Sequence, residues 1–419
     1  LTGGATIERR VVRDIHRPEL VLAVSNFVGG TSVDATELGY DALCRVSVRN
    51  GSNCTYNVRS ELTGDMGSAY AYDMAGNFAG QAVSYNYDGQ VEEEGTLTYA
   101  YDDAGRLASV SSNGVTLATY AYDPQGRRVL KVTPTATHTY FYDGWTLVRE
   151  VIERDGEECE AVDYCWGRDL SGSLDGAGGV GGLLYVKMAG GVYAPLYDHN
   201  GNVTAYVDRN GAVVARYAYD AFGAIRSATG PMADAFRFRF STKYTDPESG
   251  LSYYGYRYYS PKSRIWLTRD PLGEDAGLNL HSFCGNNPLN AFDAQGRAGL
   301  SWLELQKKRM EWRLLASMAW PFFPVAADFL LHSLNDAPVD PYIHGNGSRP
   351  SNVVKASPQY RNAIMGFVKT VKGRWTSDEY KHVTSVTFNW RDGWNTEIDL
   401  HLAINRADVQ LKGDFCRSG

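Results

Sequence analysis

The sequence predicts a mainly β protein. Tyrosine (28 residues) and glycine (44 residues) are abundant in the 419-residue chain, whereas phenylalanine (15) and methionine (7) are less common. Aromatic side chains suit a pleated sheet, and glycine supplies the positive φ angles of tight turns. A short turn motif also recurs through the first half, and alternating residues typical of a strand follow it. We therefore expect strands joined by tight turns.

The recurring motif reads Tyr-Asp-x-x-Gly-Arg/Asn. Its copies are GYDALCR (39–45), AYDMAGN (71–77), AYDDAGR (100–106), AYDPQGR (121–127), LYDHNGN (196–202) and AYDAFGA (218–224), with shorter echoes NYDG (86–89) and FYDG (141–144). The aspartate can accept the N–H two residues on, and the glycine takes the left-handed conformation. Any single Tyr-Asp pair is therefore interpreted as a turn and not as a catalytic acid.

Where neighbouring copies lie about 20 residues apart, each has the size of one β-hairpin, which cannot bury its own face and must stack on its neighbours. Seven or eight such units are too few to enclose a large cavity, since a solenoid must wrap several turns first. The sequence therefore predicts a partial spiral of hairpins over residues 1–235.

Composition excludes some functions. The net charge of −7 gives no basic footprint for nucleic acid, so we expect no nucleic-acid binding through the repeats. Six scattered cysteines form neither a disulfide framework nor a paired metal motif, although Cys44 with Cys54, and Cys159 with Cys165, could each pair across a hairpin. We expect no metal and no cofactor.

Targeting signals are not visible. The chain begins LTGGATIERR, without a charged and apolar leader, which suggests that Leu1 lies inside a longer protein. No apolar run has the length of a transmembrane segment. The nearest, in 314–334, is interrupted by Pro321 and Pro324 and carries Asp328 and His332.

Residues 236–297 form a second pattern, rich in tyrosine. It contains Gly250-Leu251, Arg257 to Tyr259 and Asp270-Pro271, and it ends in Asp293 to Arg297. Alternating aromatics over 253–259 can place one face against a sheet and leave hydroxyl groups free to bond. We interpret them as packing that holds the segment that follows.

The repeats and this block together resemble the Rhs family, the insecticidal toxin-complex C subunits and the teneurins, over roughly residues 35–297. The repeat-associated core of that family contains Gly-Leu-Tyr-Tyr, Arg-Tyr-Tyr-x-Pro, Trp-x-x-x-Asp-Pro, Asn-Asn-Pro and Asp-Pro-x-Gly-Leu, with which 250–297 falls in register. The resemblance implies a YD-repeat β-sheet spiral that closes into a shell.

The resemblance also implies chemistry. In the family this block acts as an aspartyl-protease-like element that cuts its own chain after the closing motif, which places the catalytic carboxylates at Asp270 and Asp293 and the cut between Arg297 and Ala298. One of two adjacent carboxylates keeps a proton and acts as acid, while the other activates water. We expect Arg269 to hold Asp270 charged.

The closing motif departs from the family, because proline is replaced by Ala294 and leucine by Arg297. A bulky cation does not suit an apolar pocket, so two alternatives stay open: cleavage after Arg297, or a shell that no longer cuts. In the second, Asp270 caps the turn before Pro271 and Asp293 caps the turn at Gly296.

Residues 298–419 form a separate α+β domain in this interpretation. Apolar spacing predicts helices over 300–320, 324–334 and 358–371, and strands after 382 with a hairpin at Asp392-Gly393. In Rhs proteins this segment is exchangeable cargo, often a toxin. His344, His382 and His401 have no metal-ligand spacing, and no nucleophile elbow or phosphate loop is present.

Three functions fit the sequence. The first is a shell with a self-cleaving core (236–297) that encloses a polymorphic-toxin tail (298–419) used in bacterial competition. The others are an effector enzyme in that tail and a cell-surface adhesion or carbohydrate-binding scaffold. For the first, we expect a secreted or cell-surface protein whose partners are its own tail and an immunity protein or secretion-system component.

Overall fold

The computed structural model describes residues 5–297, 299–301, 386–388, 397–404 and 407–414. They are arranged in antiparallel strands and three short 3-10 helices. The chain divides into two compact units, one of residues 1–170 and 177–304, the other of residues 171–176 and 305–419. The prediction of a mainly β protein is confirmed.

The first unit begins with two small antiparallel sheets. The five-stranded sheet contains β1 (Ile7–Arg13), β2 (Val21–Val28), β3 (Thr31–Tyr40), β4 (Val46–Arg49) and β5 (Ser52–Asn53). The three-stranded sheet contains β6 (Thr55–Tyr56), β7 (Leu62–Asp65) and β8 (Ser68–Ala69).

Fourteen strands then form one sheet in sequence order, each antiparallel to its neighbours. They are β9 (Val83–Tyr85), β10 (Val91–Glu94), β11 (Leu97–Tyr101), β12 (Leu107–Ser112), β13 (Val115–Tyr122), β14 (Arg128–Val132), β15 (Thr137–Asp143), β16 (Thr146–Glu153), β17 (Glu160–Trp166), β18 (Leu183–Met188), β19 (Gly191–Tyr197), β20 (Val203–Asp208), β21 (Val213–Tyr219) and β22 (Ile225–Thr229). Stacked hairpins produce this order, because each repeat pairs only with the units beside it.

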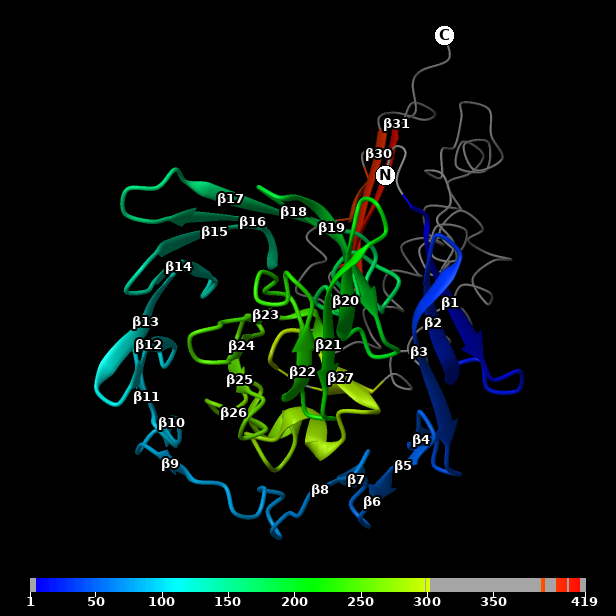
Figure 1. The fold of residues 1–419 in the computed structure, drawn as a ribbon, viewed down its shortest axis with the longest axis horizontal. Helices are drawn as coiled ribbons and strands as arrows, with labels where there is room; N and C mark the ends of the chain where they lie inside the picture. Colours follow the sequence, from blue (N-terminus) through cyan, green and yellow to red (C-terminus); the bar gives the residue numbers. More distant parts are fainter. Residues whose placement is uncertain (1–4, 298, 302–385, 389–396, 405–406, 415–419) are drawn as a thin grey trace. The chain divides into compact units, whose positions relative to one another are not determined.

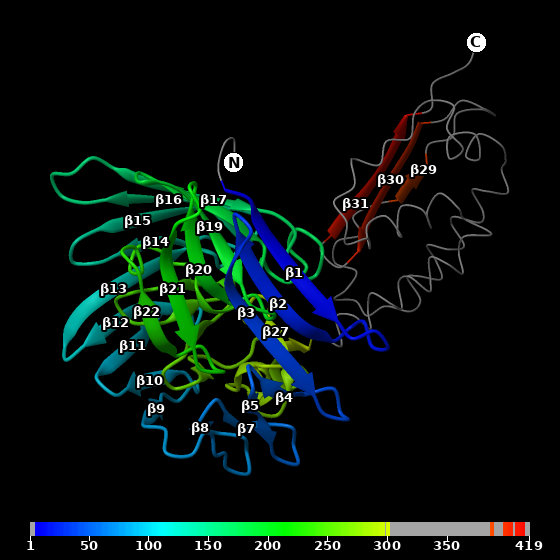
Figure 2. The ribbon, with the colours of Figure 1, turned by 45° about the vertical axis from the view of Figure 1, so that its right-hand side comes forward.

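The tyrosine-rich block lies on the concave side of this sheet, which curves around it (Figures 1 and 2). Its elements are η1 (Phe240–Thr242), β23 (Tyr244–Thr245), β24 (Ser252–Tyr253), β25 (Tyr258–Ser260), β26 (Ile265–Trp266), η2 (Gly273–Ala276), η3 (Phe283–Asn286) and β27 (Ala291–Asp293), and β28 (Gly299–Ser301) directly follows the block. Strands β23 to β26 form one sheet, and β27 pairs with β28.

The block supplies the inner half of the core. Tyr253 and Tyr258 pack with Tyr99 and Tyr120 of the large sheet, and Phe236 and other aromatics fill the core under the later strands. Burial of these large side chains is the main force that holds the block inside the curved sheet.

The turn chemistry predicted for the repeats is confirmed. At the copy that begins with Tyr122, the Asp123 Oδ1 atom accepts the N–H groups of Gln125 (3.0 Å) and Arg127 (2.9 Å). Gly126 has a φ of +86°, the left-handed conformation that glycine adopts without strain.

The two cysteine pairings that the sequence left open are not formed, since Cys44, Cys54, Cys159 and Cys165 are all free thiols. Cys159 lies directly before β17 and Cys165 lies within it. Six residues of extended chain span about 20 Å, which exceeds the reach of a disulfide.

In the second unit, β29 (Val386–Phe388), β30 (Glu397–Ile404) and β31 (Ala407–Asp414) form an antiparallel sheet. The predicted helices over 324–334 and 358–371, and the Asp392-Gly393 turn, lie outside the described residues. Of the helix predicted over 300–320, only Leu300 and Ser301 are described, and they are strand: Leu300 lies opposite Phe292, so β27 satisfies backbone groups that a helix would have paired internally. Residues 302–320 lie outside the described residues.

Candidate active site

Three segments of the terminal block meet at the side chain of Arg257, which lies directly before β25. Asp270 follows β26, and Asp293 ends β27. The Arg257 Nη2 atom lies 2.5 Å from Asp270 Oδ2 and 3.5 Å from Asp293 Oδ2. The two carboxylate oxygens are therefore within about 6 Å of each other, the sum of those distances. All three residues are buried, with exposed fractions of 3%, 8% and 1%.

Arg257 also holds the main chain of the closing turn. Its Nε donates to the carbonyl oxygen of Gly296 (2.6 Å), and its Nη2 donates to that of Arg297 (3.0 Å). Its Nη1 donates to the carbonyl oxygen of Leu280 (3.1 Å), and its Cζ lies 4.2 Å from the centre of the Trp266 ring. The guanidinium is fixed on every side, and Nη2 touches the carbonyl of the residue before the predicted cut.

Asp293 organises the same turn from within. Its Oδ1 accepts the N–H groups of Gln295 (3.0 Å), Gly296 (2.7 Å) and Arg297 (3.1 Å). Gly296 has a φ of +78°, and a Cβ there would lie 3.1 Å from the Arg257 nitrogen. Glycine thus allows both the turn and the close approach of the Arg257 backbone, and it leaves Asp293 Oδ2 facing Arg257.

The buried surroundings shift the pKa values of Asp270 and Arg257 from their ordinary values. Burial raises the pKa of Asp270 above its ordinary value, and the nearby Asp293 adds to this, although Arg257 opposes it. Burial lowers the pKa of Arg257. A carboxyl group that holds its proton more strongly than usual is better suited to act as a general acid.

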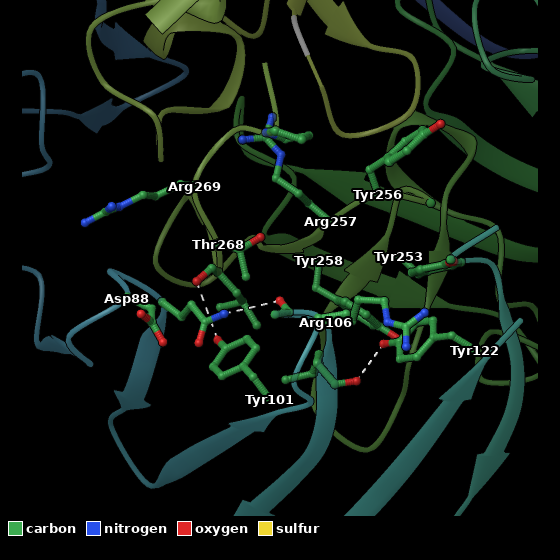
Figure 3. A pocket seen from close by; sticks show the side chains of 18 residues that line it. Asp88, Tyr101, Arg106, Tyr122, Tyr253, Tyr256, Arg257, Tyr258, Thr268 and Arg269 are labelled. Carbon is green, nitrogen blue, oxygen red and sulfur yellow. Dashed lines mark hydrogen bonds between the residues drawn. The ribbon is translucent and has the colours of Figure 1, made fainter. Parts of the chain in front are cut away.

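The structure thus brings Asp270 and Asp293 to one guanidinium, but Arg269 is not the cation beside them. A Cβ on Gly89 would lie 2.3 Å from Arg269 Nε, so the Arg269 side chain runs over that repeat turn. The contact that we expected of Arg269 is made by Arg257, whose side chain extends in another direction (Figure 3). Ala298 lies outside the described residues.

Arg257 is the residue that sequence reasoning missed, although one signal was available. It stands within a run of tyrosines, of which Tyr253, Tyr254, Tyr258 and Tyr259 are buried in the core and Tyr256 is exposed. A buried arginine requires acidic partners, and Asp270 and Asp293 were the candidates at hand.

A cavity of about 340 Å³ adjoins the site. The repeat turns contribute Asp88 and Arg106 to its wall, and the terminal block contributes Tyr256, Arg257 and Arg269 (Figure 3). Arg257 thus belongs both to the wall of this cavity and to the site, although its side chain is only 2% exposed.

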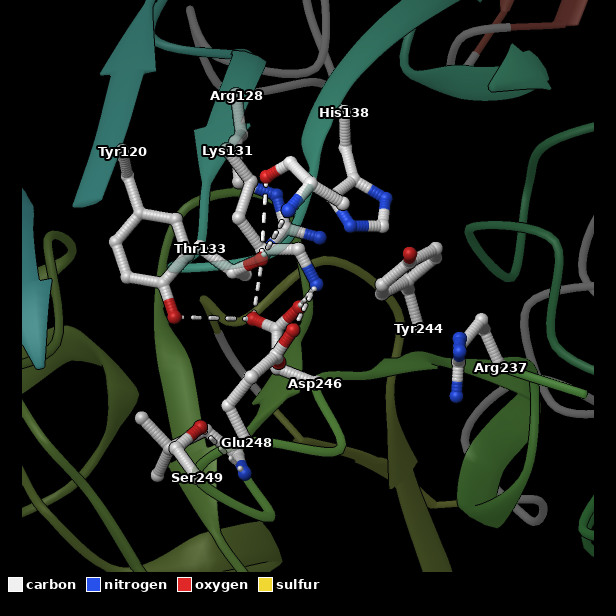
Figure 4. Close-up of polar contacts among 12 residues, drawn as sticks. Tyr120, Arg128, Lys131, Thr133, His138, Arg237, Tyr244, Asp246, Glu248 and Ser249 are labelled. Carbon is white, nitrogen blue, oxygen red and sulfur yellow. Dashed lines mark hydrogen bonds and ion pairs between the residues drawn. The ribbon is translucent and has the colours of Figure 1, made fainter. Parts of the chain in front are cut away.

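A second buried cluster anchors the block to the large sheet (Figure 4). Asp246 pairs with Arg128 Nη1 (2.6 Å) and Lys131 Nζ (3.1 Å), both on β14, and Lys131 also pairs with Glu248 (2.9 Å). The pKa of Asp246 is lowered: burial alone would raise it, but the two cations lower it more. Each charge has a partner, so the cluster fixes the block on β14 without an uncompensated buried ion.

Among the described residues no group of three or more histidine, cysteine or acidic side chains could hold a metal ion. In the same part of the chain, no helix has the length and apolar character needed to cross a bilayer.

Comparison with known proteins shows which family the fold belongs to. Residues 69–288 match the family model described as Teneurin YD-shell. A tRNA3(Ser)-specific nuclease, WapA of Bacillus spizizenii, is 28% identical over 279 residues, which are 64% of this chain and 11% of that protein. Toxin subunit YenC2 of Yersinia entomophaga is 41% identical over 102 residues, 24% of this chain and 10% of that protein.

Solved structures show the same fold. The TcdB2-TccC3-Cdc42 crystal structure superposes with a TM-score of 0.58 at 16% identity, covering 70% of this chain and 18% of the other. The matched region of this chain spans only about a tenth of the length of WapA and of YenC2. The family match extends over more than half of the sequence, from the repeats to the tyrosine-rich block, and the chain belongs to the teneurin YD-shell family.

Proposed function

We propose that residues 236–297 are a self-cleaving element that hydrolyses the peptide bond between Arg297 and Ala298. The observation that carries the proposal is the position of Arg257 Nη2, which contacts the carbonyl oxygen of Arg297 and both aspartates. A fixed donor at the carbonyl that becomes an oxyanion is what hydrolysis of a peptide bond requires.

Each residue has a role in this proposal. Asp293 Oδ2 takes a proton from a water molecule, whose oxygen attacks the carbonyl carbon of Arg297. Arg257 stabilises the negative charge that develops on the carbonyl oxygen. Asp270, whose pKa is raised by burial, is the general acid that gives a proton to the departing nitrogen of Ala298. The products are a carboxylate on Arg297 and an amine on Ala298.

We further propose that the YD-repeat sheet is part of a toxin-type shell and that residues 298–419 are its cargo. Relatives named as toxins and nucleases support this, as does the curvature of the sheet around the terminal block. Secretion or cell-surface display, an immunity protein and a secretion-system component belong to the same proposal.

The test is the intact mass of the purified full chain beside an Asp293→Asn variant. We expect wild-type protein to give two fragments that join at Arg297 and Ala298, and the variant to give one full-length mass. A single full-length mass in both would overturn self-cleavage and leave a shell that no longer cuts.

A further inference from the structure

The side chain of Arg297 lies on an aromatic stack. Its Cζ is 4.4 Å from the centre of the Tyr256 ring. Tyr256 in turn stacks on Trp145, with ring centres 4.4 Å apart and planes inclined by 28°. Trp145 comes from the turn between β15 and β16, whereas Tyr256 and Arg297 belong to the terminal block. Three distant segments thus form one stack at the residue before the predicted cut.

The backbone is shaped to bring these groups together. Gly255 has a φ of +110°, and a Cβ there would lie 3.3 Å from the Trp145 ring. The Tyr256 N–H donates to the carbonyl oxygen of Gln295 (3.0 Å), which fixes the ring beside the closing turn. The conformation of Gly255 and the hydrogen bond from the Tyr256 N–H to Gln295 therefore hold the Tyr256 ring between Trp145 and Arg297.

Arg297 is bound there by its charge and its flat face. Its Nε atom is buried and makes no hydrogen bond to any residue that the structure describes. An arginine over a tyrosine face is attracted by the ring quadrupole, more strongly when it is shielded from water. A leucine at this position would lose that attraction, whereas a lysine would keep part of it.

We propose that Trp145 and Tyr256 form a recognition platform that selects a cationic side chain at the residue before the cut. This inference rests on the proposed self-cleavage. The platform is aromatic, so the cation that would be unfavourable in an aliphatic pocket is the side chain that it binds. Tyr256 and Trp145 act as positioning residues, which set the Arg297 carbonyl against Arg257.

The test follows cleavage over time in full chain made by cell-free synthesis, with intact mass as readout. The variants are Arg297→Lys, Arg297→Leu, Tyr256→Phe and Tyr256→Leu, together with the double variant Arg297→Leu/Tyr256→Leu. We expect Arg297→Leu to cleave about tenfold more slowly, since cation–π contacts of this kind contribute that much. Arg297→Lys and Tyr256→Phe should keep most of the rate.

The double variant separates recognition from folding. If the platform binds the cationic side chain, Arg297→Leu should slow cleavage in the wild-type background. In the Tyr256→Leu background the same substitution should hardly change the cleavage rate. An Arg297→Leu chain that cuts as fast as wild type, or faster, would overturn this inference and leave the aspartate chemistry standing. If none of these chains is cut, the proposed function fails and the inference fails with it.

Discussion

Two turns of the molecule have almost the same sequence: Tyr-Asp-Pro-Gln-Gly-Arg at 122–127 and Phe-Asp-Ala-Gln-Gly-Arg at 292–297. In both, the aspartate Oδ1 accepts the N–H groups two and four residues on, and the glycine has a φ near +80° (+86° and +78°). In its sequence, its internal hydrogen bonds and its backbone conformation, the closing turn (292–297) is thus another copy of the repeat turn.

The partners of the two turns differ. Asp123 Oδ2 pairs with Arg127 Nε (2.7 Å), and the Arg127 carbonyl accepts the Asp123 N–H (2.9 Å). At the closing turn Arg257 takes both positions, facing Asp293 Oδ2 and the Arg297 carbonyl. The turn arginine lies over a tyrosine ring in both turns, Arg297 over Tyr256 (4.4 Å) and Arg127 over Tyr142 (5.6 Å). One buried arginine from another segment distinguishes a structural turn from a candidate active site.

The largest expected difference comes from the same substitution in each turn. Asp293→Asn keeps an oxygen for the turn N–H groups but removes the proton acceptor, so we expect cleavage to slow about a thousandfold. Asp123→Asn should leave cleavage unchanged. Intact-mass time courses measure both. Equal slowing in the two variants would mean that the effect is on folding of the turn.

Arg257→Lys comes next. A single ammonium cannot reach two carboxylates and three carbonyl oxygens, so we expect about a hundredfold slower cleavage, as for loss of an oxyanion donor. Arg127→Lys at the repeat turn is the matched control and should cut at the wild-type rate. If Arg257→Lys also cut normally, the guanidinium would have no part in the chemistry.

The glycines of the two turns, Gly126 and Gly296, should differ in how much an alanine substitution lowers the free energy of unfolding. A Cβ on Gly126 would meet nothing within 4 Å, so Gly126→Ala should cost only the left-handed conformation, about 1 kcal/mol. A Cβ on Gly296 would lie 3.1 Å from the Arg257 nitrogen and 3.2 Å from Tyr254 Cβ, so Gly296→Ala should cost about 2–3 kcal/mol. Urea unfolding in an uncleaved Asp270→Asn background measures both, and equal costs would contradict the close packing at Gly296.

The smallest effect is on pH dependence. Burial raises the pKa of Asp270, so the fraction that holds a proton falls, and the cleavage rate with it, as pH rises above that pKa. At the repeat turn the pKa of Asp123 is lowered: burial alone would raise it, but hydrogen bonds from the Arg127 backbone and side chain lower it more. Asp123 therefore holds no proton to donate. Cleavage rates across about pH 5 to 8 test this. A rate that rises with pH would exclude Asp270 as the acid.

The repeats could be predicted because their structure is local. Each Asp and Gly sets its own turn, and sequential turns require sequential pairing of strands. The two carboxylates of the candidate site were named from the resemblance of the terminal block to a known family; the structure brings both to Arg257, and their catalytic role stays a prediction.

What could not be predicted depends on distant segments. Arg257 gains its role only where β25, β26 and β27 meet, and Trp145 reaches Arg297 through Tyr256. Arg269 was expected beside Asp270 because it is adjacent in sequence, but successive side chains of an extended segment point apart. The likeness of 292–297 to the repeat turns was visible in the sequence and would have identified the closing turn.

The most direct test of the account is cleavage in water enriched in oxygen-18. Hydrolysis by the aspartate pair predicts a fragment that begins at Ala298 and a partner whose Arg297 carboxylate carries one heavy oxygen, both absent from Asp270→Asn. A cut elsewhere, a cut without heavy oxygen, or a chain that stays whole would contradict it.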